Sequence, residues 1–96
     1  MVVKYPFTED ASSGNRIRTF SALTDDDELI WHRDDEDRHV TVVQAGGWFL
    51  QLDDEIPKEL RPNETYFIPK HAWHRVLKKK PSQDLIVKIV ALNDHR

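Results

Sequence analysis

Turn-forming residues recur about every 8 to 12 positions along this chain, and this spacing constrains its fold more than any other feature. Several segments between the turns alternate hydrophobic and polar residues, as half-buried strands do. The clearest are 38–44, which is rich in valine, and 48–52, where Trp48, Leu50 and Leu52 share one face. The expected strands are 17–23, 29–32, 38–44, 48–52, 57–60, 65–68, 73–78 and 85–92.

Helix signals are poor throughout the chain. Residues 53–60 have the best helical composition, but Pro57 interrupts them. Eight or nine short strands without a convincing helix predict an all-β domain, either a sandwich or a small barrel.

Length and composition predict one globular domain over residues 1–96. The chain has 39% hydrophobic residues, as globular domains do. It has no cysteine, and this excludes disulfides, thiolate metal sites and cysteine nucleophiles. A net charge of −3 argues against nucleic-acid binding, despite the short basic run at 78–80. We expect no signal peptide, no membrane span and a cytoplasmic location.

Two segments carry residues that could hold a metal or a small polar ligand. Residues 31–34 offer His32 and Asp34, which would point to the same face of a strand. Residues 68–75 place His74 after a proline turn, and these groups could meet if the chain closes into a barrel. We expect His71 and His95 at the surface and Trp48 in the core, and we leave Trp31 and Trp73 unassigned.

In order and spacing, these segments resemble the two motifs of the cupin superfamily over roughly residues 29–90. The first motif reads His-x-His, three or four residues, Glu, six residues, Gly. His32-x-Asp34 stands at its start, Ala45 or Gly46 at its glycine, and Arg38 or His39 at its glutamate. The second reads Gly, five residues, Pro-x-Gly, two residues, His, and an Asn three residues on. It matches at Pro69 and His74, whereas Asn63 and His71 replace its glycines and Leu77 its asparagine.

The resemblance implies a single-domain jelly-roll β-barrel. It also implies a divalent metal, which in cupins is iron, manganese, nickel or zinc held by histidines and a glutamate. The matching positions here are His32, Asp34 and His74, with His39 as a fourth ligand if it faces inward.

The alternative is that Arg38 faces inward, where its planar guanidinium would bind a carboxylate or phosphate or pair with Asp34. Alternate residues of a strand share a face, so Arg38 lies on the face of Val40 and Val42, whereas His39 lies on the face of Thr41 and Val43. Two valines are more typical of a core-facing side than one valine and a threonine, which slightly favours Arg38 inside.

Three functional hypotheses remain open. The first is a metal-binding cupin that acts on or senses a small molecule. The second is a metal-free module for a sugar or carboxylate, with Arg38, Trp48 and Gln51 lining the pocket. The third is an assembly protein, a homodimer formed through the apolar strands 1–7 and 85–92. The sequence names no substrate and does not decide whether the protein is an enzyme.

Overall fold

The computed structural model describes residues 5–11, 15–80 and 83–92. Its strands run in the order β1 (Phe7–Asp10), β2 (Arg16–Phe20), β3 (Asp37–Gln44), β4 (Trp48–Leu52), β5 (Lys58–Glu59), β6 (Thr65–Ile68), β7 (His74–Lys78) and β8 (Leu85–Leu92). One short 3₁₀ helix, η2 (Asp26–Glu28), precedes β3. No helix in these ranges is long and apolar enough to cross a membrane.

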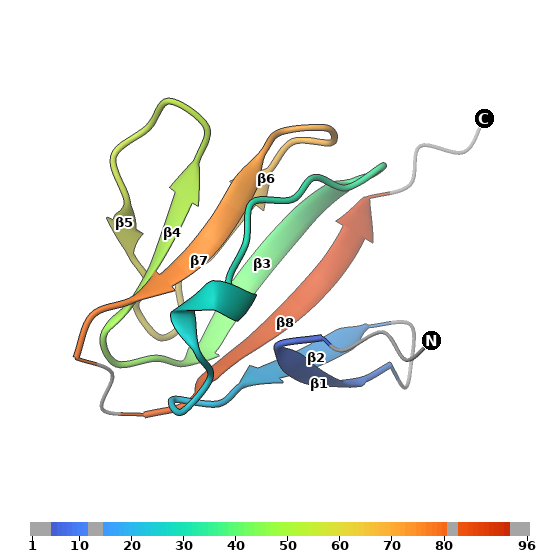
Figure 1. Ribbon diagram of the computed structural model, residues 1–96. Coiled ribbons are helices and arrows are strands. Elements are labelled where there is room, and N and C mark those ends of the chain that lie inside the picture. The colour runs from blue at the N-terminus through green and yellow to red at the C-terminus, as the bar shows by residue number, and fades with distance from the viewer. Residues whose placement is uncertain (1–4, 12–14, 81–82, 93–96) are drawn as a thin grey trace, which may run out of the picture.

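The strands form two antiparallel sheets (Figure 1). The larger sheet has the order β1-β2-β8-β3-β6, and the smaller has the order β5-β4-β7. Strands distant in sequence are therefore neighbours, as β8 lies between β2 and β3. The all-β jelly-roll prediction is confirmed.

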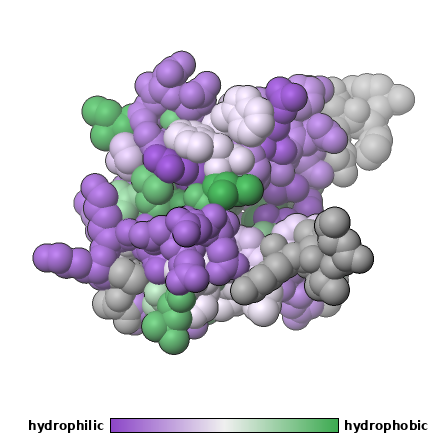
Figure 2. Space-filling model, in the orientation of Figure 1, coloured by the Kyte–Doolittle hydropathy of each residue, from purple (hydrophilic) through white to green (hydrophobic). Residues whose placement is uncertain are grey.

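The hydrophobic core lies between the two sheets, because alternate residues of each strand point inward. Trp48 of the smaller sheet and Val42 and Leu85 of the larger sheet are its most deeply buried side chains. The indole N–H of Trp48 donates a hydrogen bond to the Gln83 carbonyl, 2.9 Å away, so its one polar atom is satisfied. The face shown in Figure 2 is mostly hydrophilic, with a hydrophobic band across it.

Several strand boundaries differ from the sequence prediction, and β1 (Phe7–Asp10) covers residues 8–10, where no strand was expected. The strand expected at 29–32 is irregular chain after the 3₁₀ helix η2, and it makes a single bridge between His32 and His74, so the chain crosses there without running along a partner. The strand expected at 17–23 ends at Phe20, and the one expected at 57–60 shrinks to the two residues of β5. At 22–23 the chain turns, and the backbone N–H groups of Ala22 and Leu23 donate to the side chains of Asp84 and Ser21 instead of to a neighbouring strand.

The two motif glycine positions adopt the backbone conformation that glycine favours. Asn63 has φ 71° and His71 has φ 67°, both in the left-handed region. Asparagine and histidine are both enriched among the non-glycine residues found in this region, but a side chain there carries a conformational cost that glycine avoids. The turn is retained because its backbone is tied down, with the His71 N–H donating to the Asp34 carbonyl at 2.7 Å.

His71→Gly should raise the free energy of unfolding by about 1 kcal/mol, because glycine reaches positive φ without strain. The substitution also removes an exposed 3.6 Å ion pair between His71 and Asp35, which contributes little. Urea denaturation of both proteins measures the change, and Asp35→Ala isolates the ion pair. A His71→Gly variant less stable than Asp35→Ala would contradict the prediction.

Candidate metal and ligand site

A two-way backbone bridge joins the two halves of the site. The His32 N–H donates to the His74 carbonyl at 2.9 Å, and the His74 N–H donates to the His32 carbonyl at 2.8 Å. Alternation about this bridge puts both imidazoles on the inner side, with ring centroids 4.2 Å apart. The expectation that His32 and His74 meet is therefore confirmed.

The residues on either side of the bridge point outward and form two cation–π pairs. The Arg75 guanidinium lies 4.5 Å from the Trp31 ring, and that of Arg33 lies 5.0 Å from the Trp73 ring. Trp31 and Trp73 are 36% and 42% exposed, so both belong to the outer surface. Each pair links the two segments and supports the bridge beneath it.

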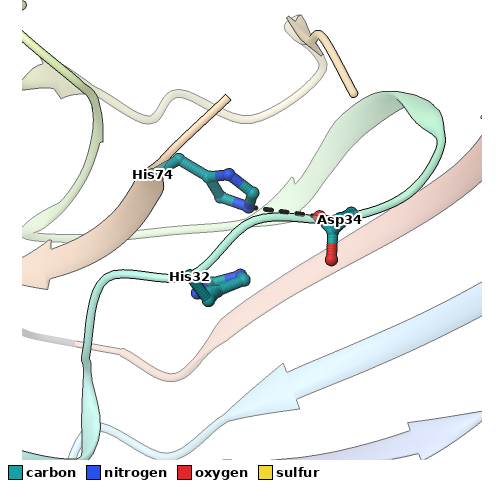
Figure 3. A group of neighbouring side chains, drawn as sticks. All are labelled: His32, Asp34 and His74. Carbon is teal, nitrogen blue, oxygen red and sulfur yellow. Dashed lines mark ion pairs between the residues drawn. The ribbon is translucent and has the colours of Figure 1, made fainter. Parts of the chain in front are cut away.

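Asp34 reaches the inner side because it follows His32 by two residues. Its carbonyl accepts the His71 N–H, which ties it to the turn before β7. Potential ligand atoms of His32, Asp34 and His74 all lie within 4.8 Å of one another (Figure 3). His74 is buried, Asp34 is half-buried and His32 keeps an exposed edge.

Both imidazoles are oriented by backbone carbonyls. The Nδ1 of His32 lies 3.2 Å from the Ile30 carbonyl, and that of His74 lies 2.8 Å from the Ala72 carbonyl. A carbonyl oxygen can only accept, so Nδ1 of each ring carries the hydrogen. In the neutral rings this leaves both Nε2 atoms as lone-pair donors, the arrangement usual in metal-ligating histidines.

The Asp34 carboxylate has an unsatisfied oxygen. Its Oδ2 atom lies 3.1 Å from Arg38 Nη1 and 3.3 Å from His74 Nε2, yet it is buried without a hydrogen bond to any described residue. Arg38 Nε is also buried without a hydrogen bond within the described ranges. A buried oxygen of this kind, 3.3 Å from His74 Nε2, is compatible with a cation ligand.

Charge and burial act in opposite directions on these groups. Burial raises the pKa of Asp34, but contact with His74 and the charge of Arg38 together lower it below its usual value. Partial burial, followed by the charge of His74, lowers the pKa of His32. Burial also lowers the pKa of Arg38, opposed by Asp34 and assisted by the positive charge of Arg18. Asp34 is therefore ionised at neutral pH.

Arg38, and not His39, faces the site. Residues of β3 alternate, so Arg38 is buried and His39 is exposed on the opposite face, where its ring contacts Phe67. The slight preference for Arg38 inside is confirmed, and His39 does not join His32, Asp34 and His74. Arg38 also approaches Glu36, whose carboxylate pairs with Arg16 at 2.8 Å.

A cavity of about 340 Å³ adjoins the site, and His32, Asp34, Arg38 and His74 line part of it. Most of its other lining residues are apolar, including Leu29, Val40, Leu50, Ile68, Val76, Leu85, Val87 and Ile89. Trp48 and Gln51 were expected to line the pocket and are not among its lining residues. Trp48 is fully buried in the core, and Gln51 accepts a hydrogen bond from Arg75 on the outer side of the smaller sheet.

Arg18 also lines the cavity, although it was not among the expected site residues. The signal was present in the triplet 16–18, since alternation in a strand places both of its arginines on one face. That face is the inner one, because Phe20, two residues on, is buried in the core.

No protein-family model and no curated protein matches this chain. Solved structures do match it in fold. A cupin domain from Bordetella pertussis Tohama I is 17% identical with a TM-score of 0.61, covering 96% of this chain and 100% of that one. The DMSP lyase DddQ from Ruegeria pomeroyi DSS-3 is 10% identical with a TM-score of 0.68, covering 93% and 48%.

The iron(II) form of HppE is 17% identical with a TM-score of 0.62, covering 81% of this chain and 42% of that one. This chain thus spans about half the length of the DMSP lyase and of that HppE chain. The protein has a small cupin fold, as the motif resemblance implied.

Arg38→Met should lower the free energy of unfolding by about 3 kcal/mol, because it leaves the Asp34 carboxylate half-buried without its cation. The double variant Arg38→Met/Asp34→Asn should lose less free energy of unfolding, since it leaves no unpaired charge at this site. Because the folded-state pKa of Asp34 is lowered, its stabilising effect exists above the unfolded-state pKa and disappears as the pH falls through the folded-state value. The deficit of Arg38→Met should therefore shrink in acid.

Urea denaturation at neutral and acidic pH measures these differences. Arg61→Met is the matched control, because the Arg61 side chain is 68% exposed. It should change stability by no more than about 0.5 kcal/mol. A double variant as unstable as Arg38→Met would show that the charge of Asp34 is not the cause.

Proposed function

We propose that this cupin-fold protein binds a divalent metal through His32, Asp34 and His74 and accepts a small molecule in the adjoining cavity. The observation that carries the proposal is the buried, unsatisfied Asp34 Oδ2 beside two imidazoles whose Nδ1 atoms are already engaged. Three protein ligands leave coordination positions open, as binding or catalytic sites require.

Two imidazoles and one carboxylate suit iron(II), manganese, nickel or zinc. A metal held there would act as a Lewis acid toward a ligand in the cavity. Among the structural neighbours, HppE has been determined with iron(II) and with cobalt(II). Arg38 occupies the position of the motif glutamate, and its positive charge would weaken metal binding relative to a site with that glutamate.

A metal-free binding module is the second candidate, because one observation favours it. Arg38 Nη1 lies 3.1 Å from Asp34 Oδ2, so the carboxylate already has a cation beside it. In this case the cavity would bind its small molecule through the polar groups of its wall alone. Metal content distinguishes the two candidates directly.

Protein purified without a histidine tag, and then reconstituted, should contain about one metal ion per chain by elemental analysis. His74→Ala and Asp34→Asn should each weaken metal binding by at least about 100-fold, because each removes a ligand. His39→Ala is the matched control, since it removes a histidine from the opposite face of the same sheet region.

Circular dichroism would confirm that each variant is folded before its metal content is compared. The proposal fails if the folded wild-type protein takes up no metal on reconstitution. It fails equally if His39→Ala loses as much metal as His74→Ala.

We also propose that the protein is a cytoplasmic homodimer. Absence of cysteine suits a reducing compartment. Of the two segments expected at the interface, residues 1–4 of 1–7 lie outside the described residues, and both edges of β8 (85–92) are paired within the chain. We therefore propose contact through a sheet face. Val43 and Phe67 are 54% and 49% exposed on the strands β3 and β6 of the larger sheet.

Light scattering should give twice the monomer mass, and Phe67→Glu should shift it toward the monomer. Ile56→Glu is the control, because Ile56 is 84% exposed in the loop between β4 and β5, outside the larger sheet. A wild-type monomer at micromolar concentration would exclude the dimer.

A further inference from the structure

The cavity wall is divided into a charged part and an apolar part. Its ionisable groups are Arg18, Glu28, Asp34, Arg38 and the imidazoles of His32 and His74, together with the Tyr5 hydroxyl. The remaining wall is built mainly from aliphatic and aromatic side chains of both sheets. A ligand that fits such a space has one polar end and an apolar body.

Arg18 has hydrogen-bonding capacity to spare. Its side chain is only 15% exposed and stacks on Phe7, with its guanidinium carbon 4.2 Å from the ring centroid. Nε donates to Glu9 at 2.6 Å, and the terminal nitrogens make no hydrogen bond to the residues that the structure describes. Since a guanidinium has five donor hydrogens, the terminal nitrogens of Arg18 can donate to a ligand.

Arg38 has an unsatisfied donor as well. Its Nε atom is buried without a hydrogen bond within residues 5–11, 15–80 and 83–92, and Nη1 faces the Asp34 carboxylate. If Asp34 binds a metal, part of its negative charge is taken up by that metal. The nearest remaining carboxylate is then that of Glu36, which lies 3.8 Å from Arg38 Nε and is itself paired with Arg16 at 2.8 Å, so an anionic ligand would complete the pairing of Arg38.

The charges of the wall favour an anionic ligand. Among the lining residues, Arg18 and Arg38 balance Glu28 and Asp34 when the imidazoles are neutral. Next to them, Glu9 pairs with Arg18, and Glu36 lies between Arg38 and Arg16, which adds one net negative charge. A divalent cation would therefore leave the wall with an excess of positive charge. Burying that excess beside aliphatic side chains is unfavourable unless an anion enters with it.

We infer that the ligand of this cavity is a small carboxylic acid with an apolar body, its carboxylate held by Arg18 and Arg38. This inference rests on the proposed function, because it names the ligand class of the same cavity. The planar guanidinium matches a carboxylate in two-pronged fashion. At about 340 Å³ the cavity is near the lower end of ligand pockets, which suits a small acid better than a lipid.

The test compares four six-carbon probes that differ only in the head group: hexanoate, hexanol, hexylamine and hexyl phosphate, with acetate as the head group alone. Isothermal titration gives the dissociation constants for metal-loaded and metal-free protein. Hexanoate should bind most tightly, and more tightly to the metal-loaded form. Arg18→Gln should weaken hexanoate binding about 10- to 100-fold, with metal content unchanged.

Arg38→Lys keeps the charge but loses the planar fork, and should also weaken hexanoate binding. Arg61→Gln, an exposed arginine away from the cavity, is the matched control and should leave the dissociation constant unchanged. Melting temperatures of the variants show that each is folded.

Equal binding of hexanol and hexanoate would overturn the inference, as would tighter binding of acetate or hexyl phosphate. A metal-loaded protein that binds no hexanoate would also overturn it while leaving the proposed metal site intact. If the protein takes up no metal but binds hexanoate, and Arg18→Gln abolishes that binding, the proposed ligand class is supported and the proposed metal site is rejected. If hexanoate then fails to bind, both proposals are lost.

Discussion

The backbone bridge between His32 and His74 is the interaction on which the site depends. It joins the irregular segment before β3 to the first residue of β7, through two hydrogen bonds of 2.9 and 2.8 Å. A single bridge is a weak attachment by itself. It is reinforced on the outer side by two arginine–tryptophan pairs and next to it by the bond from His71 to the Asp34 carbonyl.

The same bridge separates the side chains that face the cavity from those that face solvent. Because alternate residues point to opposite sides, one crossing of the chain presents two imidazoles to the cavity and two tryptophans to solvent. Trp31 and Trp73 therefore do not line the cavity. The cavity is lined by the inner faces of the two sheets, including Arg18 and Arg38.

Arg38 distinguishes this cupin fold from the motif that it resembles. A carboxylate at that position would add negative charge to a metal site, whereas the arginine adds positive charge and faces Asp34. The network continues through Glu36 to Arg16 on β2, so the charge of the site is balanced by neighbouring strands. We expect this cavity wall to bind a cation more weakly, and an anion more strongly, than a site with the histidines and glutamate of the cupin motif.

Much of this could be predicted from the chain. Turn spacing and alternation predicted the strands and the all-β class, and parity in 38–44 correctly favoured Arg38 over His39 inside. Motif spacing identified His32, Asp34 and His74, and even the replaced glycines at Asn63 and His71 keep positive φ. The strand pattern and the parity of Arg38 are local, because each depends on residues only a few positions apart, whereas the site residues were identified from the order of two motifs along the chain.

Other properties were decided by tertiary structure alone. The segment 29–32 has a strand-like pattern, but it meets only one residue of β7 and so forms a bridge. The cavity, the unsatisfied Asp34 oxygen and the inclusion of Arg18 arise where strands distant in sequence face one another. The sequence by itself determined which side of each strand a residue occupies. Only the packing of the two sheets decided which of those residues meet, because strand pairing and enclosed space depend on the whole chain.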